Sequence, residues 1–126
     1  MQAFLSVMKA LSDPNRIRIL KMLQHKKLCV CEIKAALGVA QPTASKHLKV
    51  LEKAALVRSE KDGLWVNYYL ADGRASPFVA TLLGNLRHWL EEEPDIVRIR
   101  ELIPSLNREK LCSKQGSKQR SCIAGK

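Results

Sequence analysis

The sequence predicts an α+β fold that is mainly α-helical and carries one small β-hairpin, and three observations lead to that prediction. Apolar residues recur at helical spacing through most of the chain, and prolines and glycines stand where the helices would begin and end. An Asp62-Gly63 step separates two strand-like segments, which is a strong hairpin signal. The chain has 126 residues and is 46% hydrophobic, enough for one modest core. We therefore expect one domain over residues 1–104, followed by a tail over residues 105–126.

Two helices are expected in the first 25 residues. The first covers residues 4–11, and the Ser12-Asp13-Pro14 step then supplies a cap and a proline at N1 for a second helix that runs to about His25. An amphipathic helix buries its apolar stripe and exposes its charges. The charged residues expected on the solvated face of the second helix are Arg16, Arg18 and Lys21.

A helix, a turn and another helix follow. The first of this pair begins around Cys31 and ends at Gly38, which stands at the C′ position where positive φ belongs. Gln41 can serve as the N-cap of the next helix and Pro42 as its first residue, and this helix ends near residues 54–55. Its expected inward face, at spacings i, i+4 and i+7, is Ala44, Leu48 and Leu51. This order predicts a helix-turn-helix.

The opposite face of the last helix is polar and basic. Hydroxyl and ammonium groups near a helix N-terminus reach the base edges and phosphates of a major groove. The candidate DNA-binding residues on this helix are Gln41, Thr43, Ser45, Lys46, His47 and Lys49. The whole chain has 22 Lys and Arg against 12 Asp and Glu, and its net charge of +10 favours a polyanionic partner. Charge alone does not choose between DNA, RNA and anionic lipid.

Two expected strands, Leu56–Glu60 and Leu64–Leu70, flank a turn at Lys61-Asp62-Gly63. The tip of this hairpin is predicted to carry Arg58 and Lys61, which suits a wing that lies along the DNA backbone or in the minor groove. The helix-turn-helix and the hairpin together predict a winged helix-turn-helix protein that binds double-stranded DNA.

The C-terminal part of the domain predicts a homodimer. Pro77 at N1 opens a helix over residues 77–93 whose apolar stripe is too wide for a lone surface helix. We assign that helix, with the first helix of the chain, to a dimer interface. A last short helix over residues 96–103 ends before Pro104. A two-fold dimer is expected to bind an inverted repeat in operator DNA, with half-sites roughly 34–36 Å apart.

The ends of the chain indicate its compartment and the state of its cysteines. The N-terminus lacks the basic and apolar regions of a signal peptide, and no apolar run is long enough for a membrane span. We expect a cytoplasmic protein with no membrane partner. The segment from Cys112 to Lys126 has almost no apolar residue and is expected to be flexible. In a reducing compartment, the four cysteines are expected to be thiols, metal ligands or sensors rather than structural disulfides.

Two of these cysteines, Cys29 and Cys31, stand one residue apart where the helix-turn-helix begins. Side chains at i and i+2 diverge inside a regular helix, so the two thiols converge only if one lies before the first full turn or the turn distorts. The positive end of the helix is expected to lower the pKa of both thiols. Thiolates select soft ions, so this pair is a candidate metal or metalloid site.

Three segments and the wing together resemble the ArsR/SmtB family of repressors. The segments are residues 10–20 (ALSDPNRIRIL), 28–32 (LCVCE) and 41–51 (QPTASKHLKVL), and the resemblance covers about residues 3–90. The Cys-Val-Cys step looks like the thiolate sensor of the arsenic-responsive branch. The resemblance implies a homodimeric winged helix-turn-helix repressor that leaves its operator when As(III) or Sb(III) binds as inducer. It implies neither an enzyme nor a catalytic cofactor.

One position departs from the pattern of that branch. Arsenic repressors of this type often carry a third cysteine three residues after the pair, where this chain has Lys34. Cys112 and Cys122 are the candidates for a third metal ligand, from the same chain or from its partner. These two cysteines can equally be incidental or serve redox or accessory metal chemistry.

Other inducers and another protein class stay open as alternatives. Cadmium and lead sensors with the same cysteine step add cysteines from an N-terminal arm, and residues 1–11 contain none. Zinc sensors use carboxylates and histidines on the helix after the wing, which here offers a lone His88. A repressor of the same fold whose thiols sense oxidation or reactive sulfur is the main alternative. A thiol enzyme such as an arsenate reductase would need a Cys-x5-Arg loop, and Lys118 stands in the arginine place after Cys112.

Overall fold

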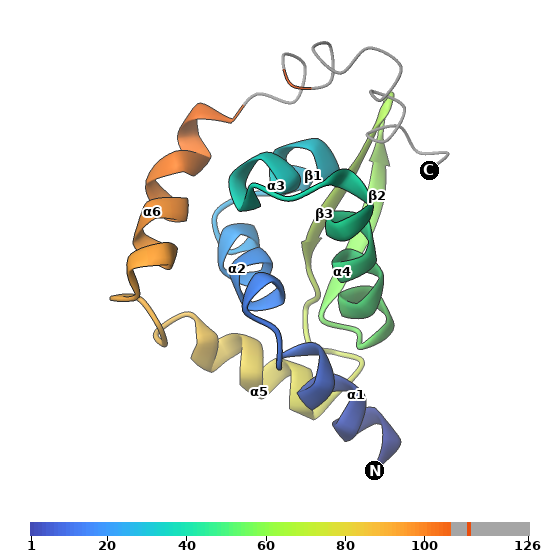
Figure 1. Ribbon diagram of the computed structural model, residues 1–126. Helices are drawn as coiled ribbons and strands as arrows, with labels where there is room; N and C mark the ends of the chain where they lie inside the picture. The colour runs from blue at the N-terminus through green and yellow to red at the C-terminus, as the bar shows by residue number, and fades with distance from the viewer. Residues whose placement is uncertain (107–110, 112–126) are drawn as a thin grey trace.

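The computed structural model describes residues 1–106 and residue 111, and it is mainly α-helical with a small antiparallel sheet. Its helices are α1 (Gln2–Ala10), α2 (Pro14–Leu23), α3 (Val30–Leu37), α4 (Gln41–Lys53), α5 (Pro77–Leu86), α6 (Pro94–Leu102) and a short 3-10 helix (Ile103–Ser105). Its strands are β1 (Leu28–Cys29), β2 (Val57–Asp62) and β3 (Trp65–Leu70) (Figure 1). The α+β class is confirmed. Most of the tail predicted over residues 105–126 lies outside the described residues, so the division into domain and tail stays a prediction.

Local capping explains where α2 begins and α3 ends. The Asp13 carboxylate accepts hydrogen bonds from the backbone N–H groups of Asn15 and Arg16, at 2.7 and 3.3 Å. Pro14, the first helical residue, lacks an N–H that would have needed a partner there. Gly38 follows the last residue of α3 with φ of 71°, in the left-handed region. Both features are as the sequence predicts.

The hairpin predicted around Asp62-Gly63 is present, and it belongs to a three-stranded sheet in the order β1-β3-β2. β2 pairs antiparallel with β3 along its whole length. The sequence does not predict β1, whose residues Leu28 and Cys29 pair with Tyr68 and Asn67 of β3. Two residues are too few to show the alternation that identifies a strand. The pairing anchors the segment before α3 to the hairpin.

The core lies where α2, α3 and α4 pack on one another and on the sheet. Its large and fully buried side chains are Ile19, Leu20, Met22, Leu28, Ile33, Leu48, Leu51 and Leu56. Burying an apolar side chain of this size contributes about 1.5–3 kcal/mol. This shared packing fixes α3 against α4, which is the spatial relation that a helix-turn-helix requires.

Lys21 holds the turn that follows α5. The predicted helix over residues 77–93 is wrong, because α5 stops at Leu86. Lys21 is only 3% exposed rather than solvated. Its ammonium donates hydrogen bonds to the carbonyl oxygens of Leu86 (2.8 Å) and Trp89 (2.9 Å), and to the Glu91 carboxylate. Because carbonyls at a helix end need partners from outside the helix, this buried cation stabilises the early stop. The hydrogen bond from Lys21 lowers the pKa of the Glu91 carboxyl.

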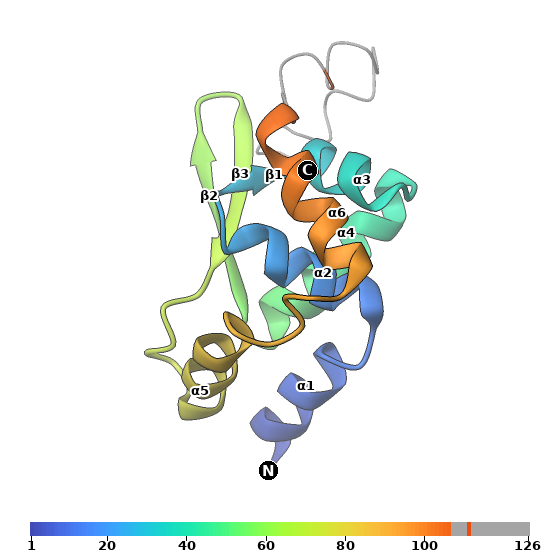
Figure 2. The ribbon, with the colours of Figure 1, turned by 90° about the vertical axis from the view of Figure 1, so that its left-hand side faces the viewer.

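The elements divide the molecule into two ends. α1 and α5 lie together at one end, and the turn between β2 and β3 lies at the other (Figures 1 and 2). α6 packs along α2 on the side away from the hairpin (Figure 1). None of the helices in the described part of the chain is long and apolar enough to cross a bilayer.

Candidate DNA-binding surface and thiol site

α4 has the two faces that the sequence predicts. The residues that it buries are Ala44, Leu48 and Leu51. On its other side, Thr43, Lys46 and Lys49 are exposed, and Gln41, Ser45 and His47 are half-buried. Gln41 is not the N-cap, because Ala40 holds that position and Pro42 occupies the second helical position. A proline is tolerated there since the first-turn N–H groups have no partner inside the helix. The polar face therefore starts in the first turn, where the helix end favours an anion.

Arg16 connects α4 to the end of α1. Its side chain donates hydrogen bonds from Nε to the carbonyl oxygen of Ala10 (2.7 Å) and from Nη2 to that of Lys9 (3.2 Å). Its Nη1 lies 3.3 Å from Nδ1 of His47. The prediction of a solvated Arg16 is wrong, because all these contacts draw the side chain inward. The sequence carries no local signal for the contact with His47, which lies 31 residues away.

The two basic residues predicted at the hairpin tip lie in different places. Lys61 pairs with Val66 near the turn, whereas Arg58 pairs with Tyr69 at the root of the hairpin. The tip placement of Arg58 is wrong because β2 continues to Asp62, which is farther than the sequence predicts. Both side chains are exposed.

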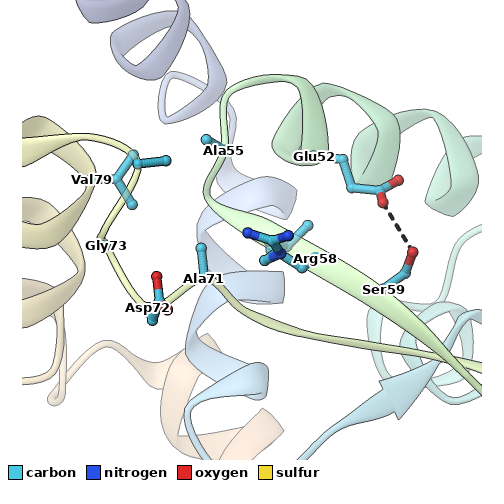
Figure 3. Close-up of a pocket in the computed structure, with 10 residues that line it drawn as sticks. Glu52, Ala55, Arg58, Ser59, Ala71, Asp72, Gly73 and Val79 are labelled. Atoms are coloured by element: carbon cyan, nitrogen blue, oxygen red, sulfur yellow. Dashed lines mark hydrogen bonds between the residues drawn. The ribbon is translucent and has the colours of Figure 1, made fainter.

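Arg58 lines a pocket of about 330 Å³ at the root of the hairpin (Figure 3). The end of α4, the start of β2 and the loop before α5 form this pocket. On one side, Ser59 donates a hydrogen bond to the Glu52 carboxylate at 3.1 Å, and Asp72 lines the other side. Two carboxylates beside one guanidinium offer a phosphate a less favourable field than the face of α4 does.

Cys29 and Cys31 lie where β1 meets α3. Cys29 has extended backbone (φ −89°, ψ 170°) and is the N-cap of α3, whereas Cys31 belongs to the first turn. One cysteine therefore lies before the first full turn, which is the condition under which neighbouring thiols at i and i+2 can converge. Both side chains are fully buried.

Glu32 completes the cap of α3, and the sequence analysis missed it. Its carboxylate accepts a hydrogen bond from the backbone N–H of Cys29 at 3.0 Å, and the Cys29 side chain faces the backbone N–H of Glu32. This reciprocal arrangement is a capping box with cysteine in place of serine or threonine. The Cys-x-x-Glu spacing is its signal in the sequence. Glu32 is only 5% exposed, so its charge acts at close range on the thiol.

Burial raises the pKa of the Cys29 thiol to about 11. Hydrogen bonds from the backbone N–H groups of Glu32 and Cys31 act in the opposite direction, and the Glu32 carboxylate adds to the rise. The expected lowering of the pKa by the helix end is therefore wrong for Cys29, because desolvation of the thiolate outweighs it. Cys29 is a protonated thiol at neutral pH.

Cys31 is disulfide-bonded, and Cys29 keeps its thiol. The expectation of a thiol thus does not hold for Cys31 in this structure, and its role as a metal ligand stays a prediction. Cys112 and Cys122 lie outside the described residues. Within residues 1–106 and 111, no three His, Cys, Asp or Glu side chains gather into a group that could hold a metal ion.

Apolar side chains gather where α1 meets α5. The rings of Phe4 and Phe78 pack edge to face, with centroids 5.2 Å apart. The large apolar residues exposed at this end are Met1, Phe4, Leu5, Phe78, Trp89 and Leu90. A pocket of about 140 Å³ beside them is lined by apolar side chains alone. A monomer rarely leaves a continuous apolar patch open to water, so this end favours a protein partner.

Comparisons with known proteins agree with this arrangement. Residues 13–59 match the family described as bacterial regulatory protein, arsR family. The arsenic resistance transcriptional regulator ArsR1 of Pseudomonas putida is 33% identical over 101 residues, which are 76% of this chain and 77% of that protein. The structure of reduced HlyU from Vibrio cholerae is similar with a TM-score of 0.59 and 28% identity, over 71% of this chain and 90% of that one. The structure of the homodimeric winged helix-turn-helix DNA-binding domain of Mb0332 from Mycobacterium bovis is similar with a TM-score of 0.58 and 29% identity. The match covers 68% of this chain and 76% of that one.

Proposed function

Because this chain belongs to the ArsR/SmtB family of winged helix-turn-helix regulators, we propose that it is a repressor that arsenite or antimonite releases from operator DNA. Membership of the family makes the chain a DNA-binding transcriptional regulator, since its homologues are regulators rather than enzymes. The proposal adds a homodimer, an inverted-repeat operator and As(III) or Sb(III) as the inducer. The similar regulator from Pseudomonas putida, which is named for arsenic resistance, supports this choice of inducer.

The observation that carries the proposal is the position of Cys29 and Cys31 at the start of α3, which packs against α4. Sulfur donors suit a soft ion. An ion bound at the start of α3 therefore acts on the helix that supports the DNA-binding helix. Allosteric couplings of about 1–3 kcal/mol already change an affinity by roughly 5–150-fold. A displacement of the first turn of α3 is sufficient, without refolding of the domain.

The capping box at the start of α3 is the structural element through which ion binding would be coupled to α4. A soft ion binds the thiolate rather than the thiol, so binding at Cys29 replaces the thiol proton and draws the sulfur away from the N–H of Glu32. Losing an N-cap costs a helix about 0.5–2 kcal/mol, which lies in the range that the coupling needs. Once the disulfide at Cys31 is reduced, Cys29 and Cys31 offer two sulfur donors, and we assign the third to Cys112 or Cys122.

We place the DNA on the face that α4 and the hairpin share. The proposed contacts are Gln41, Thr43, Ser45, Lys46, His47 and Lys49 from α4, Lys61 near the hairpin turn and Arg58 at its root. Of these residues, five are exposed, and this exposure and the net charge of +10 support the assignment; the five are Thr43, Lys46, Lys49, Arg58 and Lys61. Contacts with phosphates release counterions, so the affinity should fall steeply with salt.

Fluorescence anisotropy of the reduced protein on its own promoter DNA, titrated with arsenite, tests the proposal. Cadmium and zinc serve as parallel titrants. Cys29→Ser should keep its DNA binding and lose the release by arsenite. Lys46→Ala is the matched control and should bind more weakly with and without arsenite. Tight binding that ignores arsenite contradicts the proposal, and release by cadmium alone favours the cadmium or lead sensor.

The disulfide at Cys31 favours a second candidate function, a repressor of the same fold whose thiols sense oxidation or reactive sulfur. The similarity to reduced HlyU, a protein described by its redox state, is consistent with it. The two functions differ in which cysteine they need. Release by diamide that dithiothreitol reverses, and that disappears in Cys31→Ser but persists in Cys29→Ser, would establish the redox function. Release by arsenite under reducing conditions would establish the first.

A further inference from the structure

We propose that Arg16 is a positioning residue for DNA recognition, because its guanidinium holds His47 of α4 as the neutral tautomer with its hydrogen on Nε2. This inference deepens the proposed function and rests on it for the role of α4 in DNA binding. Arg16 belongs to α2, and through His47 it determines which hydrogen-bonding group α4 presents to DNA.

The tautomer follows from the chemistry of the two groups. A guanidinium has five N–H donors and no acceptor. Nη1 of Arg16 lies 3.3 Å from Nδ1 of His47, so Nδ1 accepts this hydrogen bond and carries no hydrogen. The hydrogen bond at one ring nitrogen of a neutral imidazole fixes the state of the other. His47 is thereby a hydrogen-bond donor through Nε2.

The remaining contacts of Arg16 fix the position of its guanidinium. Nε and Nη2 donate to the carbonyl oxygens of Ala10 and Lys9, at 2.7 and 3.2 Å. These carbonyls lie at the end of α1, where a helix leaves its last carbonyls without internal partners. One planar side chain therefore satisfies the end of α1 and reaches His47 on α4 at the same time. A lysine has no such fork of donors.

Asp13 is the acidic group of this cluster. Its carboxylate caps α2 through the N–H groups of Asn15 and Arg16. Burial alone would raise the pKa of Asp13, but those two backbone hydrogen bonds and the charge of Arg16 lower it below its ordinary value. Asp13 thus stays ionised at neutral pH and offsets the charge of the guanidinium.

A hydrogen-bond donor that is held in place on α4 binds acceptor groups of the DNA. An Nε2–H suits an acceptor such as guanine O6 or N7, or a phosphate oxygen. With Nδ1 held by Arg16, a flip of the ring that would offer DNA an acceptor costs the contact with Arg16. Arg16 therefore acts on recognition through His47 rather than by a contact of its own.

The first test measures the tautomer in the full chain without DNA. Long-range ¹H–¹⁵N correlation spectra report which imidazole nitrogen carries the hydrogen. His47→Gln identifies the signals of His47 among those of the three histidines. We expect the Nε2–H form alone in the wild-type protein and an added Nδ1–H population in Arg16→Met. An Nδ1–H form or an even mixture in the wild-type protein overturns the inference, whether or not any variant folds.

The second test is a double-mutant cycle on operator affinity. Arg16→Met and His47→Ala should each weaken binding about tenfold, and the double variant should lose about the same factor because the two residues act as a unit. Arg18→Met is the matched control on α2, since Arg18 bonds to Asn15 (2.8 Å) and Asp95 (2.5 Å) instead. Its affinity should stay within about twofold of wild type.

The outcomes separate the two proposals. Losses that multiply to about a hundredfold in the double variant overturn the role of Arg16, because independent sites contribute additively to the free energy. If the wild-type protein does not bind its promoter DNA, the proposed function fails, while the spectra still decide the state of His47. Circular dichroism of each variant checks that its helices are intact.

Discussion

Lys21 is a buried cation whose hydrogen bonds hold the turn between α5 and α6. In Lys21→Met the aliphatic stem remains, but the carbonyls of Leu86 and Trp89 lose the hydrogen bonds from the ammonium, although the Leu86 carbonyl keeps the one from the N–H of Trp89. An unsatisfied buried polar group costs about 1–3 kcal/mol, so we expect the free energy of unfolding in urea to fall by about 2–3 kcal/mol. Lys26→Met, at an exposed lysine, should change it by less than about 0.5 kcal/mol. Equal stability of Lys21→Met and the wild-type protein would refute this account of the turn.

Lys21 and Arg16 also show what a residue pattern leaves out. The apolar spacing of α2 correctly predicts buried residues such as Leu20, yet it assigns every charge to the outer face. Lysine and arginine have long aliphatic stems that can cross buried surface. The acceptors of Lys21 include backbone carbonyls 65 and 68 residues away, and no side-chain type in the sequence marks a backbone carbonyl. Such contacts follow only from the folded chain.

At the scale of elements, Gly38 sets the turn between α3 and α4. Its φ is 71°, and a Cβ built on it would meet no atom within 4 Å, so the backbone conformation alone decides the cost of Gly38→Ala. Placing alanine in the left-handed region should destabilise the protein by about 1–2 kcal/mol. Gly84→Ala in α5 is the matched control, because its site is also open but its φ is ordinary. Gly84→Ala should stabilise by up to about 1 kcal/mol. Thermal unfolding measures both effects, and midpoint temperatures that shift in the same direction for the two variants would contradict this explanation.

The sequence predicts those elements whose starts, ends or turns are determined by residues adjacent in the chain. Asp13-Pro14 starts α2, Gly38 ends α3 and Asp62-Gly63 turns the hairpin, and each acts through its immediate neighbours. β1 and the length of α5 depend on partners distant in the chain, namely β3 and Lys21. The thiol site divides in the same way. The place of Cys29 before α3 follows from local spacing, whereas its raised pKa depends on burial by the whole core.

At the scale of the whole molecule, the hairpin turn that we propose for DNA contact is far from the surface proposed for a second copy. The hairpin turn and the apolar end of α1 and α5 lie at opposite ends of the protein (Figures 1 and 2). One copy can therefore contact another copy and DNA at the same time. Two linked DNA-binding surfaces gain affinity from their high effective concentration without any new contact. The proposed homodimer should therefore bind DNA more tightly than a single copy does.

Phe78→Glu tests this relation. Phe78 packs against Phe4 and is 39% exposed, so a carboxylate there would face the apolar surface of a second copy. A buried charge without a partner is costly, and we expect sedimentation equilibrium to show dimers for the wild-type protein and monomers for Phe78→Glu. Operator affinity should fall by at least about tenfold, because each half-site then binds alone. Leu64→Glu is the control for association, since Leu64 is 70% exposed at the hairpin turn and should leave the dimer intact. A Phe78→Glu protein that keeps its helices and stays dimeric would move the interface away from α1 and α5.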